Sequence, residues 1–175
     1  MTGSSCGWEF LQYLDALEWL DIFDSNDQTQ LPENMRSLTS LLELTINDCP
    51  TLGMLPEWLG ELCSLRVLII MGTPMMDSLP QSIGLLTSLT NLTIECHNLE
   101  QLPETFQHLI SLRILTLVEC GALTALPECI GKLSALLVLD VIQCSAIQCL
   151  PKSIKHLTNL QQLRIIGCPD LAKAL

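Results

Sequence analysis

The sequence predicts an α/β solenoid: a curved, right-handed rod with a parallel concave β-sheet of about seven strands and short helical or 3-10 turns on the convex side. Six Leu-Pro pairs recur at a nearly constant interval, starting at Leu31, Leu55, Leu79, Leu102, Leu126 and Leu150. A fixed period of about 24 residues is typical of proteins built from stacked units. Apolar residues make up 49% of the chain but aromatic residues only 4%, which indicates an aliphatic, repetitive core.

Each repeat begins with a turn that starts at the Leu-Pro pair. In residues 55–78, Pro56 presets φ at the first position of a helical turn, where a missing N–H group costs little. Leu59 and Leu62 lie three residues apart, so this turn has one apolar face. The pattern predicts a short helical or 3-10 segment on the convex side.

Each repeat then continues as a β-strand, because apolar residues recur at every second position. In the same repeat, Leu65, Leu68 and Ile70 are expected to face the core, while the residues between them face outward. The register extends upstream by one further period, so the chain opens with a partial repeat. The one-residue deletion before Cys96 is expected only to tighten a loop. Seven strands are predicted, centred near Trp19, Glu43, Val67, Asn91, Ile114, Val138 and Gln162.

Two parts are expected along the chain. Residues 1–30 form an N-terminal partial repeat acting as a cap, and residues 31–175 form an array of six repeats of about 23–24 residues, the last one truncated. Because solenoids need capped ends, four residues are expected to pack across the first strand: Phe10, Leu11, Tyr13 and Leu14. The last residue stands where the next Leu-Pro pair would fall, so we interpret the chain as a piece of a longer protein or a decayed relative. Its uncapped ends could self-associate.

The sequence contains no recognisable catalytic, cofactor-binding or metal-binding motif. None of its three histidines forms a recognisable catalytic motif with a nucleophile and an orienting acid, and no glycine-rich phosphate loop is present. We therefore expect a protein that is not an enzyme and binds no cofactor or metal. The N-terminus lacks a basic, apolar leader, and no apolar run approaches the roughly 20 residues that span a membrane. A soluble, cytoplasmic protein without a membrane partner is expected.

The cysteines agree with this location. There are nine, without a C-x-x-C pair. Four of them occupy one repeat position, and Cys96 lies beside that position in the shortened repeat; the four are Cys49, Cys120, Cys144 and Cys168. Free cysteine is among the most buried residue types. We interpret this column as buried, reduced thiols in a cytosolic protein, in preference to a disulfide ladder or a metal-binding column.

Charge is unevenly distributed. The net charge is −11, and 15 of the 19 acidic residues lie in residues 1–104, where Arg36 and Arg66 are the only basic ones. That part has a net charge of −13, and residues 105–175 have +2. In a solenoid, position in the sequence corresponds to position along the rod, so we expect an electrostatic gradient along it. An ordinary solubilising surface is the alternative explanation of these charges. The overall sign argues against nucleic acid or an anionic membrane as the main partner.

The outward strand positions form the predicted partner-binding site. A sheet face left in water normally takes polar residues, yet many of these positions are apolar. The predicted binding residues are Trp19, Phe23, Val67, Ile69, Met71, Ile114, Val118, Val138, Ile142, Arg164 and Ile166. The apolar ones from the fifth strand onward could together expose several hundred Å², about the size at which apolar patches tend to be functional. The strand propensity of Val and Ile, or burial against a missing part of a longer protein, are the alternative explanations.

The frame is that of leucine-rich repeats, and it resembles the leucine-rich-repeat region of plant intracellular disease-resistance receptors of the coiled-coil, nucleotide-binding type. Its most specific motif is Cys-Pro-x-Leu, at residues 49–52 and 168–171, and the resemblance covers residues 11–175. It implies a ligand-sensing and autoinhibitory module in plant defence. The implied partner is a pathogen effector, a guarded host protein or the receptor's own nucleotide-binding domain.

Two other functions remain open. One is a cytosolic signalling scaffold of the Ras-group leucine-rich-repeat kind, although that kind favours a 23-residue period and Asn at the inward turn, where this chain has a longer period and Cys. The other is the substrate-recognition arm of an enzyme, such as a ubiquitin ligase, whose catalytic domain is missing. Flanking sequence would separate these possibilities.

Overall fold

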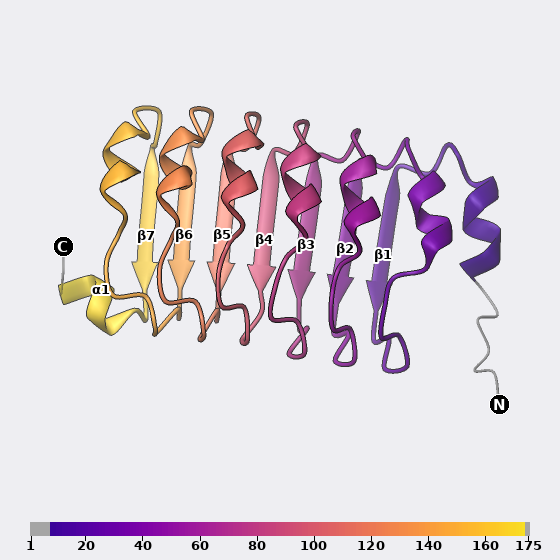
Figure 1. The fold of residues 1–175 in the computed structure, drawn as a ribbon, viewed down its shortest axis with the longest axis horizontal. Coiled ribbons are helices and arrows are strands. Elements are labelled where there is room, and N and C mark those ends of the chain that lie inside the picture. The colour runs from indigo at the N-terminus through magenta and orange to yellow at the C-terminus, as the bar shows by residue number, and fades with distance from the viewer. Residues whose placement is uncertain (1–7, 174–175) are drawn as a thin grey trace.

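The computed structural model describes residues 8–173, which form one parallel sheet with its strands in sequence order (Figure 1). Each strand pairs with the next at an offset of one repeat, so Trp19 lies beside Glu43 and Glu43 beside Val67. The parallel sheet and all seven predicted strands are confirmed, although each strand begins at the residue predicted as its centre. The strands are β1 (Trp19–Phe23), β2 (Glu43–Asn47), β3 (Val67–Met71), β4 (Asn91–Glu95), β5 (Ile114–Val118), β6 (Val138–Ile142) and β7 (Gln162–Ile166).

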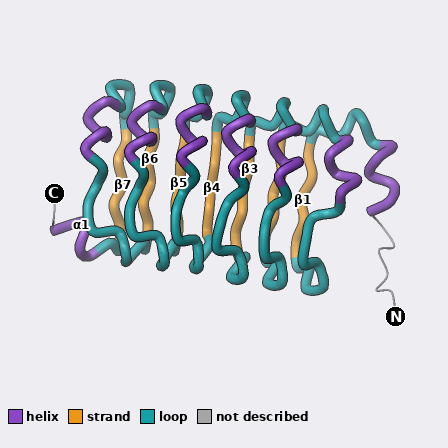
Figure 2. The backbone as a smooth tube through the Cα atoms, viewed as in Figure 1, coloured by secondary structure: helices purple, strands orange, loops and turns teal. Residues whose placement is uncertain are grey.

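A row of 3-10 helices forms the second layer, in front of the sheet in Figures 1 and 2. Pro56 has an extended conformation, with φ −74° and ψ 153°, immediately before η3. Leu62 directly follows that helix, and its N–H group donates to the carbonyl of Leu59 at 3.1 Å, as in a 3-10 turn. The helices are η1 (Trp8–Tyr13), η2 (Glu33–Ser37), η3 (Glu57–Glu61), η4 (Gln81–Leu85), η5 (Glu104–His108), η6 (Glu128–Lys132) and η7 (Lys152–His156), and α1 (Pro169–Lys173) follows β7.

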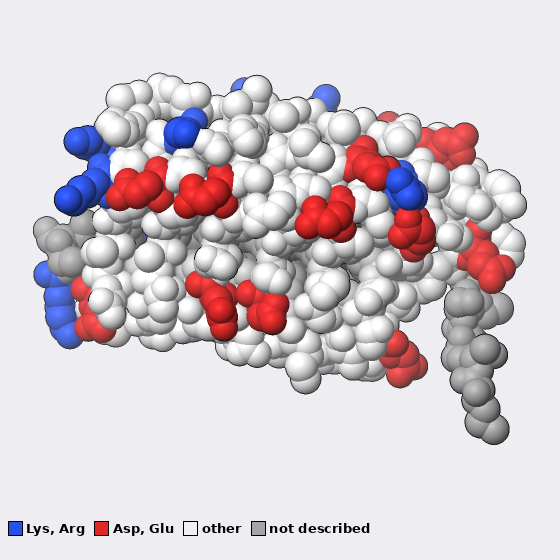
Figure 3. All heavy atoms as spheres, in the orientation of Figure 1, with Lys and Arg blue, Asp and Glu red and all other residues white. Residues whose placement is uncertain are grey.

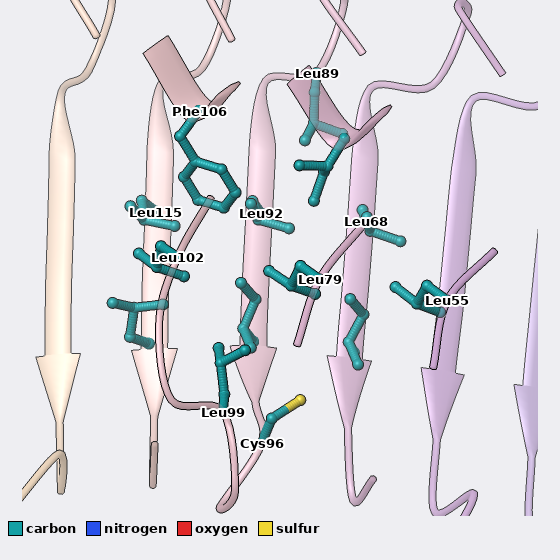
Figure 4. Close-up of a cluster of buried hydrophobic side chains, with 14 of the residues drawn as sticks. Leu55, Leu68, Leu79, Leu89, Leu92, Cys96, Leu99, Leu102, Phe106 and Leu115 are labelled. Atoms are coloured by element: carbon teal, nitrogen blue, oxygen red, sulfur yellow. The ribbon is translucent and has the colours of Figure 1, made fainter. Parts of the chain in front are cut away.

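The core lies between the sheet and the helix row and is almost wholly aliphatic. Leu65, Leu68 and Ile70 are fully buried, as predicted. Figure 4 shows how leucines from successive strands and Leu-Pro turns line up along the rod, with the ring of Phe106 among them. Fully burying one Leu side chain stabilises the fold by about 2 kcal/mol. Stacking therefore lets every repeat bury an apolar face that none could bury alone.

The residue after most strands has a left-handed conformation. Its φ is +52° to +68°, at Asp24, Asp48, Gly72, Glu119, Gln143 and Gly167. The shortened fourth repeat lacks this residue, because Cys96 directly follows Glu95 at the end of β4. The deletion, which the sequence predicts only to tighten a loop, thus removes the left-handed residue. The pairing of β4 with β5 nevertheless continues in register from Asn91 to Glu95.

Glycine determines how closely helices approach along the convex row. A Cβ atom at Gly84 would lie 2.5 Å from the carbonyl oxygen of Thr105 in the next helix, far inside contact distance. Two other junctions have the same contact, Gly60 with Ser82 and Gly131 with Ser153. A glycine late in one helix is thus matched by a small hydroxyl residue early in the next.

The two ends of the described rod differ from its middle. Of the four residues expected to pack across β1, only Leu11 is buried, while Phe10, Tyr13 and Leu14 are 67%, 73% and 45% exposed. At the other end, the core-facing Leu163 of β7 is 40% exposed. That residues 1–30 act as a cap stays a prediction. No helix within the described residues combines the length and apolarity needed to cross a membrane.

Candidate functional site: the concave sheet face

The concave face is the side of the sheet turned away from the 3-10 helices. Each strand contributes its first, third and fifth residues to this face, because successive side chains alternate between the two sides. All the predicted binding residues lie on it, in three rows that run from β1 to β7. The structure therefore brings the predicted site residues onto one surface and gives each a defined neighbour.

The part of this face on β5, β6 and β7 is aliphatic, and we call it the aliphatic end. Ile114 lies beside Val138 in the first row, and Val118, Ile142 and Ile166 lie side by side in the last row. Ile166 is 51% exposed, and the other four are half-buried. Cross-strand pairs of β-branched residues stabilise a sheet, but the faces of these side chains that point away from the sheet remain open to a partner.

An ion pair between the buried Asp140 and the half-exposed Arg164 separates these two aliphatic rows. Asp140, in the middle row of β6, is only 2% exposed although it points away from the core. Arg164 donates from Nε to Oδ1 at 2.8 Å and from Nη2 to Oδ2 at 2.5 Å, and Gln162 donates to Oδ1 at 3.2 Å. These bonds, that of Arg164 first, lower the pKa of Asp140. The guanidinium of Arg164, a predicted binding residue, is thus already engaged within the chain.

A second aliphatic group lies on β3. Val67, Ile69 and Met71 are all half-buried and form one short column across the three rows. Their neighbours on β4, Asn91, Thr93 and Glu95, are polar, so this strand divides the β3 group from the aliphatic end.

The part of the face on β1 and β2 is aromatic and acidic, and we call it the aromatic–acidic end. Trp19 and Phe23 of β1 are 62% and 54% exposed. Asp21 lies between them on the same side of the strand, and Glu43 of β2 lies beside Trp19. On the opposite, helical side of the molecule, Figure 3 shows Asp and Glu along the whole length, whereas Lys and Arg gather mainly toward the C-terminal end. On that side the expected charge gradient therefore comes from the basic side chains.

The cysteine column runs along the edge where the strands end. Cys120 and Cys144 each direct Sγ toward a backbone carbonyl of the preceding repeat, at 3.7 Å from the oxygens of Ile94 and Leu117. In the shortened repeat, Cys96 contacts the hydroxyl of Thr73 at 3.1 Å, and burial raises the pKa of Cys96 to about 11. These thiols act as small, buried groups that bond one repeat to the next.

One group of metal-ligand types converges in the described part of the chain. Ligand atoms of Glu95, His97 and Glu119 lie within 4.8 Å of one another. Nε2 of His97 is 3.1 Å from a carboxylate oxygen of Glu119, and both side chains are about half exposed. The contact of these solvated side chains accounts for their proximity, so we assign no metal site here. The sequence did not reveal this group, because its members follow or end β4 and β5, which lie side by side only in the folded chain.

Sequence reasoning also missed the Asp140 ion pair. Its signal in the sequence is an Asp at the third strand position of one repeat and an Arg at the same position of the next. The parallel register places these two residues side by side. In the N-terminal part, the exposure of Phe10 and Tyr13 was missed because apolar residues near a solenoid end were expected to pack inward.

No known protein-family profile matches the chain, and no curated protein matches it by sequence. Solved structures do match. The leucine-rich-repeat domain of the type III effector XopL is 30% identical, with a TM-score of 0.80 over 94% of this chain and 65% of that one. TLR13, in complex with ssRNA13, is 21% identical, with a TM-score of 0.68 over 91% of this chain and 26% of that one. The plant peptide hormone receptor RGFR1, in complex with RGF2, is 18% identical, with a TM-score of 0.55 over 89% and 33%.

The chain spans less than two thirds of the length of each of these structures. Below 25% identity, the likeness to TLR13 and RGFR1 shows the fold alone. Together with the open parallel sheet and its 3-10 turns, these matches show that the chain is a leucine-rich-repeat solenoid. Solenoids of this kind are typically interaction scaffolds with an extended concave binding surface.

Proposed function

We propose that this leucine-rich-repeat chain is a protein-recognition module whose docking surface is the concave face. The observation that supports this most directly is the aliphatic end, where solvent-facing positions hold Ile114, Val118, Val138, Ile142 and Ile166. Such positions are normally polar on a sheet face that stays in water. Strand propensity alone does not explain the choice, because β4 fills the same three positions with Asn, Thr and Glu.

The surface has the general anatomy of a protein interface. Aliphatic side chains lie in two rows, and a fully bonded polar group, Asp140 with Arg164 and Gln162, separates them. A partner that covers this region would bury apolar surface without leaving the carboxylate unpaired, which would otherwise cost binding free energy. The core of an interface is depleted in free charges in the same way.

The finer proposal is that the chain is the ligand-sensing and autoinhibitory part of a plant intracellular immune receptor. It rests on the Cys-Pro-x-Leu motifs at residues 49–52 and 168–171 and on cysteine at the inward-turn position. In this function, the concave face binds a pathogen effector, a guarded host protein or the receptor's own nucleotide-binding domain, in the cytoplasm.

The comparison with XopL favours a second candidate. At 30% identity over 94% of this chain, the matched structure is the leucine-rich-repeat domain of a bacterial effector, and so one part of a larger protein. The repeats would then be the recognition arm of a longer chain that acts on what they bind. Sequence encoding the flanking regions separates the two candidates, since a nucleotide-binding domain upstream favours the receptor and a catalytic domain on either side favours the recognition arm.

The docking surface is tested with Ile142→Glu, which places a charge in the last aliphatic row. Its control is Ile110→Glu, the same substitution at a residue that is 61% exposed and precedes β5. Partners captured with the wild-type chain are identified, purified and titrated by calorimetry. We expect Ile110→Glu to bind like the wild type and Ile142→Glu to bind about 100-fold more weakly. A folded Ile142→Glu chain with wild-type affinity would contradict the concave docking surface.

A further inference from the structure

The exposed rings of this aromatic-poor chain lie on the aromatic–acidic end or in η1, which precedes it. Of its seven aromatic residues, four lie in the first 23 positions and are more than half exposed: Phe10, Tyr13, Trp19 and Phe23. Trp58 and Phe106, in the middle of the rod, are buried in the core. Because large rings lose favourable burial when they stay in water, exposed Trp and Tyr are enriched where a partner binds.

Carboxylates surround these rings. Asp21 lies between Trp19 and Phe23 on β1, and Glu43 lies beside Trp19. Asp24 follows β1 at an exposed left-handed position. Within residues 8–173, none of these three carboxylates accepts a side-chain hydrogen bond or forms a salt bridge. Asp140, at the other end of the same face, is by contrast fully bonded.

Basic residues that could neutralise this end are already engaged or lie further along the sheet. Arg36 bonds Glu33 and Glu61, at 2.8 Å from each, in the helix row. Arg66 directly precedes β3, two strands away from β1. With a net charge of −13 over residues 1–104, this end has a negative potential that attracts cations.

A hollow lies next to the start of β1. It is lined by the ring of Tyr13, by the aliphatic Leu14 and Leu17, and by Asp15. A ring, an aliphatic wall and a carboxylate are the groups that receive a Lys or Arg side chain, since its alkyl stem packs on apolar surface and its cation interacts with both π-face and carboxylate.

We propose that the aromatic–acidic end binds a Lys- or Arg-rich, extended segment of a protein partner. This inference rests on the proposed function, because it names the partner chemistry at one end of the same concave face. The rings of Trp19 and Phe23 contact the alkyl stems and cations, and Asp21 and Glu43 pair with the charges. A second copy of this chain is the less favoured occupant, because its exposed lysines Lys132, Lys152 and Lys155 lie in the helix row and not on an extended segment. Its Arg164 is bonded to Asp140 and its Lys173 to Asp170.

The test uses the 175-residue chain and a fluorescent peptide of alternating Arg and Gly, with a Gln–Gly peptide of equal length as its control. We expect the Arg peptide to bind and the Gln peptide not to, with affinity falling about tenfold between about 50 and 300 mM NaCl. Trp19→Ala should weaken binding about tenfold and Asp21→Asn about threefold. Both residues are exposed, so both variants should fold like the wild type by circular dichroism.

Glu104→Gln is the matched control, because it removes one exposed negative charge from the helix row. It should leave peptide binding unchanged. Absence of peptide binding, equal binding by Trp19→Ala, or equal weakening by Glu104→Gln would each overturn the inference. A fourth outcome would change the occupant of this surface. If the peptide did not bind but the chain self-associated with increasing concentration, and Trp19→Ala abolished that association, the occupant would be a second copy of the chain. The proposed function is tested separately. If the peptide experiments overturned this inference while Ile142→Glu weakened binding of an identified partner, the proposed function would still stand.

Discussion

The two ends of the concave face are built on the same backbone and carry opposite chemistry. β1 and β6 have the same length, the same parallel pairing and the same alternation, yet one presents Trp19, Asp21 and Phe23 and the other Val138, Asp140 and Ile142. The middle residue is aspartate in both. Asp21 is exposed, whereas Asp140 is 2% exposed and held by Arg164. The fold therefore leaves the outward positions free to vary, and the next repeat decides what each residue does.

This difference separates two energetic roles for one residue type. An exposed aspartate loses little hydration on folding, so its removal changes stability only slightly. A buried aspartate is stable only while its hydrogen bonds are complete. The aliphatic end thus contains a charge pair that is bonded within the chain, and the aromatic–acidic end contains exposed charges without a side-chain partner among the described residues.

Removing Arg164 should have the largest effect on this contrast. Arg164→Leu leaves the buried carboxylate of Asp140 without its main donors, and we expect it to lower the free energy of unfolding. Asp21→Asn, at the position of β1 that is equivalent to Asp140, should change the free energy of unfolding by less than about 0.5 kcal/mol. Urea denaturation followed by circular dichroism measures both. Equal effects for the two variants would show that the ion pair is not structural.

The loss of unfolding free energy caused by Arg164→Leu should depend on pH. Because the pKa of Asp140 is lower in the folded chain than the value of about 3.9 in the unfolded one, the ion pair stabilises the fold above pH about 4. This contribution is lost as pH falls through the folded-state pKa. Denaturation of wild type and Arg164→Leu at pH 7 and near pH 3 should therefore give a smaller difference at the lower pH. A difference that stays constant would mean that Arg164 stabilises by packing.

The left-handed positions give a smaller contrast between the ends. Gln143, after β6, has φ +56°, and Asp48, after β2, has φ +52°. Aspartate adopts this conformation more readily than glutamine. Gln143→Gly should stabilise the chain by about 1 kcal/mol and Asp48→Gly by less than about 0.5 kcal/mol. Melting temperatures of the two variants check the order, and the reverse order would count against conformational strain as the cause.

Removing two like charges from the acidic end should have the smallest effect on stability. Asp24 and Asp48 occupy adjacent left-handed positions, so their like charges repel. The double variant Asp24→Asn and Asp48→Asn should stabilise the chain by about 0.5 kcal/mol at low salt, and the gain should disappear near about 1 M NaCl. Replacing Lys152 and Lys155 by Gln at the other end is the control, and it should give no such gain.

The repeat pattern was sufficient to predict the fold and the positions of the site residues. Leucine recurring at core positions forces the same side of every strand inward, so the existence of the strands and their outward residues followed from the sequence. The predicted centres were two residues too early, because each is the first residue of its strand. The bond from Arg164 to Asp140 and the exposure of Tyr13 depend on side-chain conformations that the repeat pattern does not specify.

The sequence by itself determined the stacking of this chain, because each repeat has a strand-spaced apolar segment and a Leu-Pro turn, and stacking in parallel buries both. Only the tertiary structure decided which charges are free. Asp21 and Asp140 occupy equivalent repeat positions, and what distinguishes them is the neighbour across the strand, Thr45 for one and Arg164 for the other. Electrostatic energy depends on distance and burial, and these are set only when the repeats are brought side by side.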